Sequence, residues 1–262
     1  MPLIPLSCTT CCFRDRGRDE IEETLRYAPE AGYALIGLAG PITWTEGLMQ
    51  WFDCGKLAAR LRELRLRLTE IWSAGVPTDS DEAAERFGEH LGHIAQACVS
   101  LNCPCLVVTG GRRNDQGGLE RTIRGLRGLA DRLRGTALRV CLEPHVGSQI
   151  LYPDDYAAIL DGVGSDQFGL TVDTGHFHTA GVDFLALVRK YADRVWNVHL
   201  KDHLGPQSVA IGKGEIDLAG LIATLGEISY GGVLALELEV TDPEHTVEYV
   251  RDAREYLEGL MR

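Results

Sequence analysis

Residues 168–201 read FGLTVDTGHFHTAGVDFLALVRKYADRVWNVHLK and contain one complete strand–helix–strand unit. The short runs 168–173 and 195–200 have the length and apolar character of buried strands, and 183–193 repeats its apolar residues at helical spacing. Two strands joined by a helix are typical of a parallel sheet, because a parallel pair needs a long crossover connection. The unit therefore predicts an α/β fold.

The same unit recurs along the whole chain. Strands are expected at 3–9, 33–38, 66–72, 105–109, 138–143, 168–173, 195–200 and 233–239. Helices are expected between and after them, at about 19–31, 55–65, 80–101, 117–134, 153–162, 183–193, 217–228 and 243–261. Eight such units predict a single (β/α)₈ TIM barrel, with its active site at the carboxyl ends of the strands. The alternative is a doubly wound open sheet, but that fold usually has fewer strands and a glycine-rich first turn. We predict one domain over residues 1–262.

Two of the expected helices carry local start signals. The helix near residue 80 follows Asp79, with Glu82 three residues further on, which resembles a capping box. The last helix begins with Asp242 as the capping residue and Pro243 at the first helical position.

The composition is that of an ordinary globular protein, with 45% hydrophobic and 24% charged residues. No stretch approaches the ~18 apolar residues of a membrane-spanning helix. The N-terminal segment lacks the basic start and long apolar run of a secretory signal. The 26 basic and 38 acidic residues give a formal charge of −12, which disfavours binding to nucleic acid. We predict neither a membrane nor a nucleic acid as partner.

Eight cysteines are spread through a chain that is long enough to have its own core. They do not form the two C-x-x-C pairs of a zinc ribbon, and Cys103, Cys105 and Cys141 lie in apolar runs that are typical of buried thiols. This cysteine usage fits a reducing compartment, so we predict a cytoplasmic protein.

Polar side chains occupy one face of four expected strands, near their carboxyl ends. Consecutive strand residues point to opposite sides, and a parallel barrel strand is buried on both. In the strand at 195–200, the set expected to face the helices is apolar: Trp196, Val198 and Leu200. The set expected to face the lumen ends, in each of the four strands, on a polar residue: Glu143, Asp173, His199 and Glu237.

Three carboxylates that converge on one buried mouth repel each other and need a cation. His199 adds a neutral nitrogen, so the set offers three oxygens and one nitrogen. Such a set suits one divalent metal ion with positions left for water or substrate. The hard oxygens favour Mn²⁺ or Mg²⁺, while the imidazole also suits Mn²⁺, Co²⁺ and Zn²⁺, so the expected order is Mn²⁺, then Co²⁺ or Zn²⁺, then Mg²⁺.

Each of these residues, taken alone, also has a structural explanation. A glutamate late in a strand can form a salt bridge with Lys201 or Lys213, and a histidine on an apolar strand, such as His199, can be a satisfied core residue. The coincidence of four such residues on four strands favours the metal. Glu239 lies two residues past Glu237 and is expected beyond the mouth.

Further side chains near the mouth are candidates for contact with a substrate. His145 and Lys201 have the inward parity, and for Lys201 an ion pair with a mouth carboxylate is the alternative. His176 follows Asp173 by three residues and is expected either to support the site and face the substrate or to cap a loop.

Other candidates lie on the third expected strand and in a later loop. Glu70 and Trp72 share one parity and are candidates for a substrate wall. Lys213 and Glu215 lie in a glycine-bounded loop that either covers the site or forms a solvated turn. The pattern says little about His178, and three histidines on helical patterns are expected on the surface: His90, His93 and His245.

The motifs together resemble the sugar phosphate isomerase/epimerase family of the xylose-isomerase-like TIM-barrel superfamily. The resemblance covers the second half of the chain in one consistent order: CLEPH (141–145), LTVDTGHFHTAG (170–181), NVHLKDH (197–203), IGKGEIDL (211–218) and GGVLALELE (231–239). The first half matches only in its strand–helix rhythm. By this resemblance, His176 aligns with a histidine that contacts substrate oxygen, and four residues align with the metal ligands: Glu143, Asp173, His199 and Glu237.

The resemblance implies an isomerase or epimerase of a sugar or a related polyhydroxy carbonyl compound. In the ketose 3-epimerase branch the two ligand glutamates, here Glu143 and Glu237, also act as the acid/base pair. One removes the proton next to the carbonyl, a metal-stabilised cis-enediolate forms, and the other returns the proton from the opposite face. That branch has an arginine shortly after the histidine strand, where this sequence reads HLKDHLGPQ (199–207).

Three other functions are alternatives. A dehydratase of the inosose type uses the same metal and the same first proton abstraction but then expels a β-hydroxyl. A non-catalytic barrel subunit would have an incomplete metal site. The DNA-repair endonuclease IV branch needs further histidines where this sequence reads IWSAG (71–75), VTGG (108–111) and GPQSVAIG (205–212), and the charge of −12 also argues against it.

The glycine pattern bears on the substrate. Barrels that bind phosphate typically do so at a glycine-rich helix start after the seventh or eighth strand. In GGVLALELE (231–239) the glycines instead lie before a strand. We therefore expect an unphosphorylated sugar, cyclitol or small keto acid. A homodimer is expected by analogy with other barrels of this kind.

Overall fold

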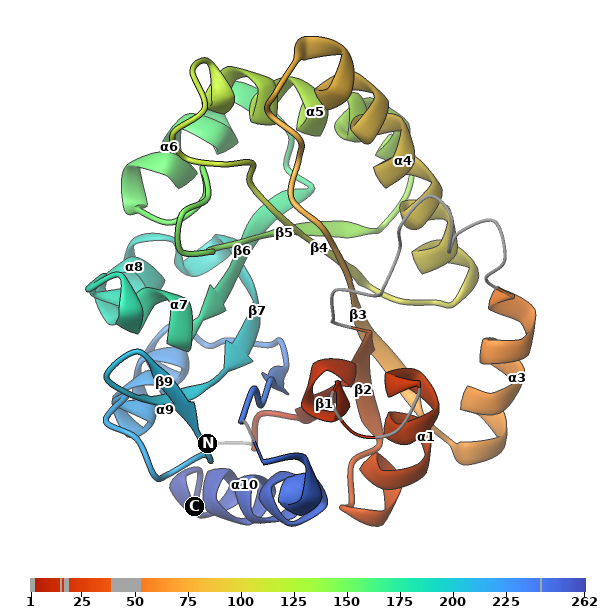
Figure 1. Ribbon diagram of the computed structural model, residues 1–262, viewed down its shortest axis with the longest axis vertical. Coiled ribbons are helices and arrows are strands. Elements are labelled where there is room, and N and C mark those ends of the chain that lie inside the picture. The colour runs from red at the N-terminus through yellow and green to blue at the C-terminus, as the bar shows by residue number, and fades with distance from the viewer. Residues whose placement is uncertain (1–2, 15, 17–18, 39–52, 241) are drawn as a thin grey trace.

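The computed structural model describes residues 3–14, 16, 19–38, 53–240 and 242–262. Within these ranges eight parallel strands close into a barrel, and the helices surround it (Figure 1). The strands are β1 (Leu6–Thr9), β2 (Leu35–Leu38), β3 (Arg67–Ser73), β4 (Cys105–Thr109), β5 (Arg139–Glu143), β6 (Phe168–Asp173), β7 (Val195–Leu200) and β10 (Leu234–Leu236). Each pairs with the next barrel strand along the chain, and β10 pairs back with β1. The predicted (β/α)₈ TIM barrel is confirmed.

The helices fill the connections in the order that the apolar spacing predicts. They are α1 (Glu20–Glu30), α3 (Cys54–Leu64), α4 (Asp81–Ser100), α5 (Gly118–Leu133), α6 (Pro153–Val163), α8 (Phe184–Lys190), α9 (Leu218–Glu227) and α10 (Thr246–Leu260). Several begin at an aspartate whose carboxylate accepts backbone N–H groups of the first turn, as Asp19 does for Ile21 and Glu22. These helices therefore start where a capping side chain satisfies free amides of the first turn.

Two predicted helix starts are corrected. The residue that caps α4 is Ser80, whose hydroxyl accepts the Ala83 N–H, rather than Asp79. The α-helical part of the last helix begins at Thr246, because the segment Pro243–His245 forms a 3₁₀ turn. Both differences are shifts within one turn of the predicted position, which local capping signals do not resolve.

Two short elements were not expected from the sequence. The segment directly after β6 forms the helix α7 (Thr174–Thr179), which the Asp173 side chain caps by accepting the His176 N–H. After β7 the chain forms an antiparallel hairpin of β8 (Asp202–Leu204) and β9 (Gln207–Val209). Both lie at the carboxyl ends of strands and so help to shape the mouth of the barrel.

Apolar side chains fill the lower part of the lumen. Cys105, Val107 and Cys141 form a buried cluster against Trp72 and Trp196. The predicted outward position of Trp196 is wrong, because the β6–β7 register shifts between Leu170 and Thr171. A Cβ placed on Gly169, which pairs with Cys141, would lie 2.5 Å from the Trp196 ring, so the missing side chain makes room for this indole.

The larger core lies between the barrel and the helices. It is built from the outward residues of the strands, such as Leu106 and Leu142, and from the inner faces of helices, such as Leu91 and Leu126. This packing fixes the strands so that their carboxyl ends meet at one mouth. Among the helices of the described residues, none has the length and apolar character needed to cross a membrane.

Candidate metal centre

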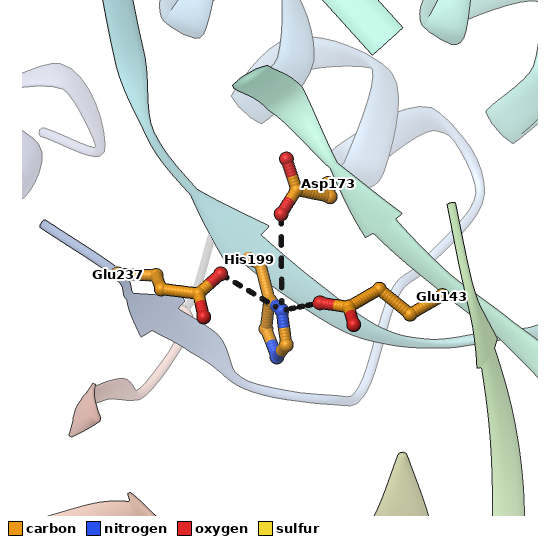
Figure 2. A group of neighbouring side chains, drawn as sticks. All are labelled: Glu143, Asp173, His199 and Glu237. Atoms are coloured by element: carbon orange, nitrogen blue, oxygen red, sulfur yellow. Dashed lines mark hydrogen bonds and ion pairs between the residues drawn. The ribbon is translucent and has the colours of Figure 1, made fainter. Parts of the chain in front are cut away.

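Four side chains converge at the carboxyl ends of four neighbouring strands (Figure 2). One ligand atom from each lies within 4.8 Å of the others, and all four residues are buried: Glu143, Asp173, His199 and Glu237. The His199 Nδ1 atom is 2.5 Å from Glu143 Oε1, 3.2 Å from Glu237 Oε2 and 4.0 Å from Asp173 Oδ2. The structure thus brings together the set of metal ligands that the sequence predicts.

Strand register explains this convergence. Asp173 on β6 pairs directly with His199 on β7, and His199 pairs with Ala235 on β10. Glu237 lies two residues beyond Ala235, on the same side, and its N–H continues the ladder by donating to Leu200 O. The strand therefore ends earlier than predicted, but its alternation carries on for one more residue and directs Glu237 to the mouth.

The geometry of the carboxylates fits a divalent cation. Asp173 Oδ2 and Glu237 Oε2 are buried and accept no hydrogen bond of good geometry from the described residues. Both atoms lie 3.1 Å from the Lys201 ammonium, which is therefore their nearest positive charge. A buried anionic oxygen without a hydrogen bond is costly unless a charge or a metal balances it. Three hard oxygens and an imidazole nitrogen are a donor set that such an ion accepts.

The pKa values of the cluster reflect this crowding. Burial raises the pKa of Asp173 from 3.8, although Lys201 acts in the opposite direction. Burial also disfavours the ionised form of Glu237, but Lys201 and His199 outweigh it and hold the pKa of Glu237 well below 4.5. Burial by itself lowers the pKa of His199, whereas the surrounding carboxylates, Glu70 first, raise it well above 6.5.

Glu70, on β3, contacts the opposite nitrogen of the histidine. Both carboxylate oxygens of Glu70 lie 3.0 Å from His199 Nε2, and the Asn197 amide donates a hydrogen bond to Glu70 Oε2. Glu70 is fully buried. The prediction that it forms a substrate wall is therefore wrong, because its carboxylate lies inside the barrel against His199. Alternation along β3 predicts that Glu70 points inward, but it cannot identify His199 as the partner of Glu70 across the lumen.

Trp72, the other residue of the expected wall, lies beside a ligand. Its indole Nε1–H donates to Glu143 Oε2 at 2.5 Å, and its ring is tilted against His145, with the ring centroids 6.2 Å apart. Trp72 is half-buried, so one ring supports a predicted ligand and contacts a predicted substrate residue.

Two histidines lie together above the cluster. The ring centroids of His145 and His176 are 4.1 Å apart, and His145 Nδ1 is 3.4 Å from Glu143 Oε2. Burial lowers the pKa of His145, and burial together with the Lys201 charge lowers the pKa of His176 to about 3. Both imidazoles are therefore neutral near pH 7 and can exchange hydrogen bonds with a polar ligand.

A cleft of about 630 Å³ opens beside His145 at the same mouth. Its walls come from the segments that follow β3, β4 and β5, and they include the close glycine pair Gly110 and Gly111. Thr109 lines this cleft, and its hydroxyl is buried without a hydrogen-bond partner among the described residues. The cleft has room for a sugar-sized molecule, and His145 on its wall lies beside Glu143 of the cluster.

Lys201 forms ion pairs with the carboxylates of the mouth. Besides Asp173 and Glu237, its Nζ atom lies 2.9 Å from Glu239 Oε2, and Lys201 is only 4% exposed. Glu239 stands outside the four-residue cluster, as expected, and also pairs with Arg14 at 3.0 Å. The structure therefore has the ion-pair alternative for Lys201, and contact of Lys201 with a substrate stays a prediction.

The loop with Lys213 and Glu215 folds against α7 and the hairpin. The Asp202 carboxylate accepts the N–H groups of Gly212 and Gly214, at 2.8 and 2.9 Å. Glu215 Oε1 lies 3.1 Å from His178 Nε2. These bonds fix the loop against the hairpin and against α7.

The histidines on the helices follow the prediction in part. His93 and His245 are exposed, as expected. His90 is only 5% exposed and packs against Phe87, with 5.6 Å between ring centroids. Its surface prediction is wrong, because His90 lies among the buried residues of α4.

A sequence model of the family described as "Xylose isomerase-like TIM barrel" matches residues 25–260. The chain belongs to this family. The resemblance seen in the motifs is therefore confirmed at the level of the superfamily. The closed eight-stranded barrel agrees with that membership.

Curated relatives carry the name inosose dehydratase. The protein from Lacticaseibacillus casei is 26% identical over 163 residues, which are 54% of this chain and 54% of the relative, so the chain spans about half the length of that enzyme. The protein from Clostridium tetani (strain Massachusetts / E88) is 25% identical over 244 residues, 78% of this chain and 80% of the relative. These relatives are enzymes, and their name is that of a lyase rather than an isomerase.

Solved structures share the fold across its full length. An L-ribulose 3-epimerase superposes with a TM-score of 0.79 at 20% identity, over 99% of this chain and 95% of the other. The IolI protein, solved with a bound zinc atom, has a TM-score of 0.79 at 16% identity, over 98% of each chain. At such identities the likeness concerns the fold alone.

Proposed function

We propose that this chain is a divalent-metal-dependent enzyme that removes the proton next to the carbonyl of a polyhydroxy compound. The observation that carries the proposal is the buried cluster of three carboxylates and one histidine at the barrel mouth. Mn²⁺ is the ion we expect, ahead of Co²⁺ or Zn²⁺ and then Mg²⁺, because it accepts both the three hard oxygens and the imidazole nitrogen. A bound ion would stabilise the negative charge that develops on the substrate oxygen as the proton leaves.

The side chains of the mouth supply the remaining parts of this chemistry. Glu143 and Glu237 approach His199 Nδ1 from opposite sides (Figure 2), so they can exchange protons with two faces of one substrate. The neutral imidazoles of His145 and His176 can hold the substrate hydroxyls. Trp72 orients Glu143 through its indole N–H.

We place loss of water first among the outcomes of this proton abstraction. In that reaction one glutamate takes the proton on the carbon next to the carbonyl, and the β-hydroxyl departs with a proton as water while a carbon–carbon double bond forms. The names of the curated relatives support this outcome, and a cyclitol ketone is then the expected type of substrate. This changes the order given by the sequence motifs, which put isomerisation first.

Epimerisation or isomerisation is the second candidate. The opposed glutamates favour it, because return of the proton from the other face inverts the same carbon without loss of water. The arginine of the 3-epimerase branch is absent from the corresponding stretch, HLKDHLGPQ (199–207), which weakens the case for that particular reaction.

Incubation with substrate in D₂O separates these outcomes. The Mn²⁺-loaded protein is given a panel of unphosphorylated ketoses and cyclitol ketones, and the products are analysed by mass spectrometry and NMR. Loss of one water supports the dehydratase, and deuterium gain without loss of water supports the isomerase or epimerase. The Glu237→Gln variant is the control and should produce neither change. If the metal-loaded protein exchanges no proton of any panel member, the proposal is contradicted.

A further inference from the structure

The carboxylate of Glu70 is placed to control the orientation of His199. It is fully buried, and both of its oxygens lie 3.0 Å from His199 Nε2, on the far side of the ring from the three mouth acids. A carboxylate accepts hydrogen bonds and a neutral imidazole has one N–H. When Nε2 carries that hydrogen for Glu70, Nδ1 presents its lone pair to the cluster.

The neighbouring strand leaves space for this carboxylate. Gly37 on β2 is the register partner of Glu70 on β3. A Cβ placed on Gly37 would lie 2.7 Å from Glu70 Oε1 and 2.8 Å from Glu70 Cγ, which is closer than real contacts allow. Any side chain at position 37 would therefore displace the carboxylate from His199.

Asn197 completes the surroundings of the carboxylate. Its amide nitrogen donates a hydrogen bond to Glu70 Oε2, and it lies 3.5 Å from the Thr171 hydroxyl. Asn197 lies on β7, two residues before His199. The strand that carries the histidine therefore also supplies a hydrogen bond that fixes the Glu70 carboxylate. Three strands therefore fix the contact between Glu70 and His199: β2 leaves the space, β3 supplies the carboxylate, and β7 supplies the histidine and the Asn197 amide.

We propose that Glu70 is a positioning residue of the metal centre, which holds His199 in the tautomer and ring orientation that ligate through Nδ1. This inference rests on the proposed metal site. Metal-bound histidines in proteins usually donate their other N–H to a carboxylate or carbonyl, and loss of that partner weakens metal binding by about 10- to 100-fold. The Glu70 carboxylate, supplied from β3, is the group in that position here.

Calorimetric titration with Zn²⁺ tests the role of Glu70. We expect Glu70→Leu, which cannot accept the Nε2 hydrogen, to bind Zn²⁺ about 10- to 100-fold more weakly than the unmodified protein. Glu70→Gln keeps an oxygen that can accept the Nε2 hydrogen, so its Zn²⁺ affinity should lie between those of the unmodified protein and Glu70→Leu. Gly37→Ala leaves Glu70 in the sequence but displaces it, so it should weaken binding as well and serves if Glu70→Leu does not fold.

A matched control removes a buried hydrogen bond next to Glu70 without touching the histidine. The Thr69 hydroxyl bonds Ser7 at 3.0 Å, so Thr69→Val should lower the melting temperature and leave Zn²⁺ affinity unchanged. The ¹⁵N spectrum of the His199 ring gives a second measurement. In the Zn²⁺-loaded protein, Nε2 should carry a slowly exchanging hydrogen, which Glu70→Leu should lose.

The outcomes separate this inference from the proposed function. Equal Zn²⁺ affinity in the unmodified protein, Glu70→Leu and Gly37→Ala would overturn the role of Glu70 while leaving the metal site intact. Equal losses in Glu70→Gln and Glu70→Leu would also overturn it, because charge alone would then explain the effect. Failure of the unmodified protein to bind Zn²⁺ would overturn the metal site and the inference together.

Discussion

The two halves of the barrel contribute differently to its mouth. Strands β5, β6 and β7 and the residue directly after β10 supply the four clustered side chains, while β3 of the first half supplies two that contact them, Glu70 and Trp72. The second half carries dense sequence motifs, whereas the first half shows only a strand–helix rhythm. The comparison teaches that a half without motifs can still supply side chains that contact the clustered residues of the other half.

The largest expected effect is loss of a ligand from the second half. Glu237→Gln replaces an anionic oxygen of the cluster by an amide, so we expect divalent metal affinity to fall by more than about 100-fold, beyond the effect of losing a supporting partner. Metal content of the purified variant, measured by mass spectrometry after dialysis, checks this. Glu227→Gln, at a surface pair with Arg189, is the control. An unchanged metal content in Glu237→Gln would mean that the ligands are misassigned.

A smaller effect is expected from the supporting half. Trp72→Phe keeps an aromatic ring but removes the N–H that Glu143 Oε2 accepts, a bond to a charged group worth about 1.5 kcal/mol. Metal affinity should therefore fall by about tenfold. Trp196→Phe removes a similar indole bond, to Asp193 O, at the other end of the barrel and should leave affinity unchanged. If the two variants behave alike in titrations with Mn²⁺, the first half does not support the ligands.

The smallest effect concerns a carboxylate–histidine pair outside the barrel. His245 Nδ1 lies 3.0 Å from Asp242, and this hydrogen bond raises the pKa of His245 above 6.5. A histidine whose pKa is raised in the folded state stabilises the protein at pH values below its unfolded pKa. That stabilisation is lost as the pH rises through its pKa in the folded protein. Because the pair is exposed, the contribution should be slight and salt-sensitive.

An NMR titration of the His245 ring measures this directly. Its pKa should lie above 6.5 in the unmodified protein and return toward 6.5 in Asp242→Asn or at high salt. A His245 pKa that is insensitive to both changes would contradict the assigned cause.

The sequence alone determined the fold of this protein and the four side chains that gather at its mouth. Alternation along each strand decides which side chains enter the lumen, and position along the strand decides which reach the mouth, so Glu143, Asp173, His199 and Glu237 could be identified from local pattern. Both features depend only on residues within one strand, so they can be recognised in the sequence without knowing which strands are neighbours.

Only the tertiary structure decided which side chains contact each other across the lumen. Glu70 and His199 are 129 residues apart, and no local pattern records that they touch. The register shift at Trp196 and the burial of His90 depend in the same way on distant neighbours. Closure of the barrel brings these residues together, because it fixes the stagger of every strand against the next.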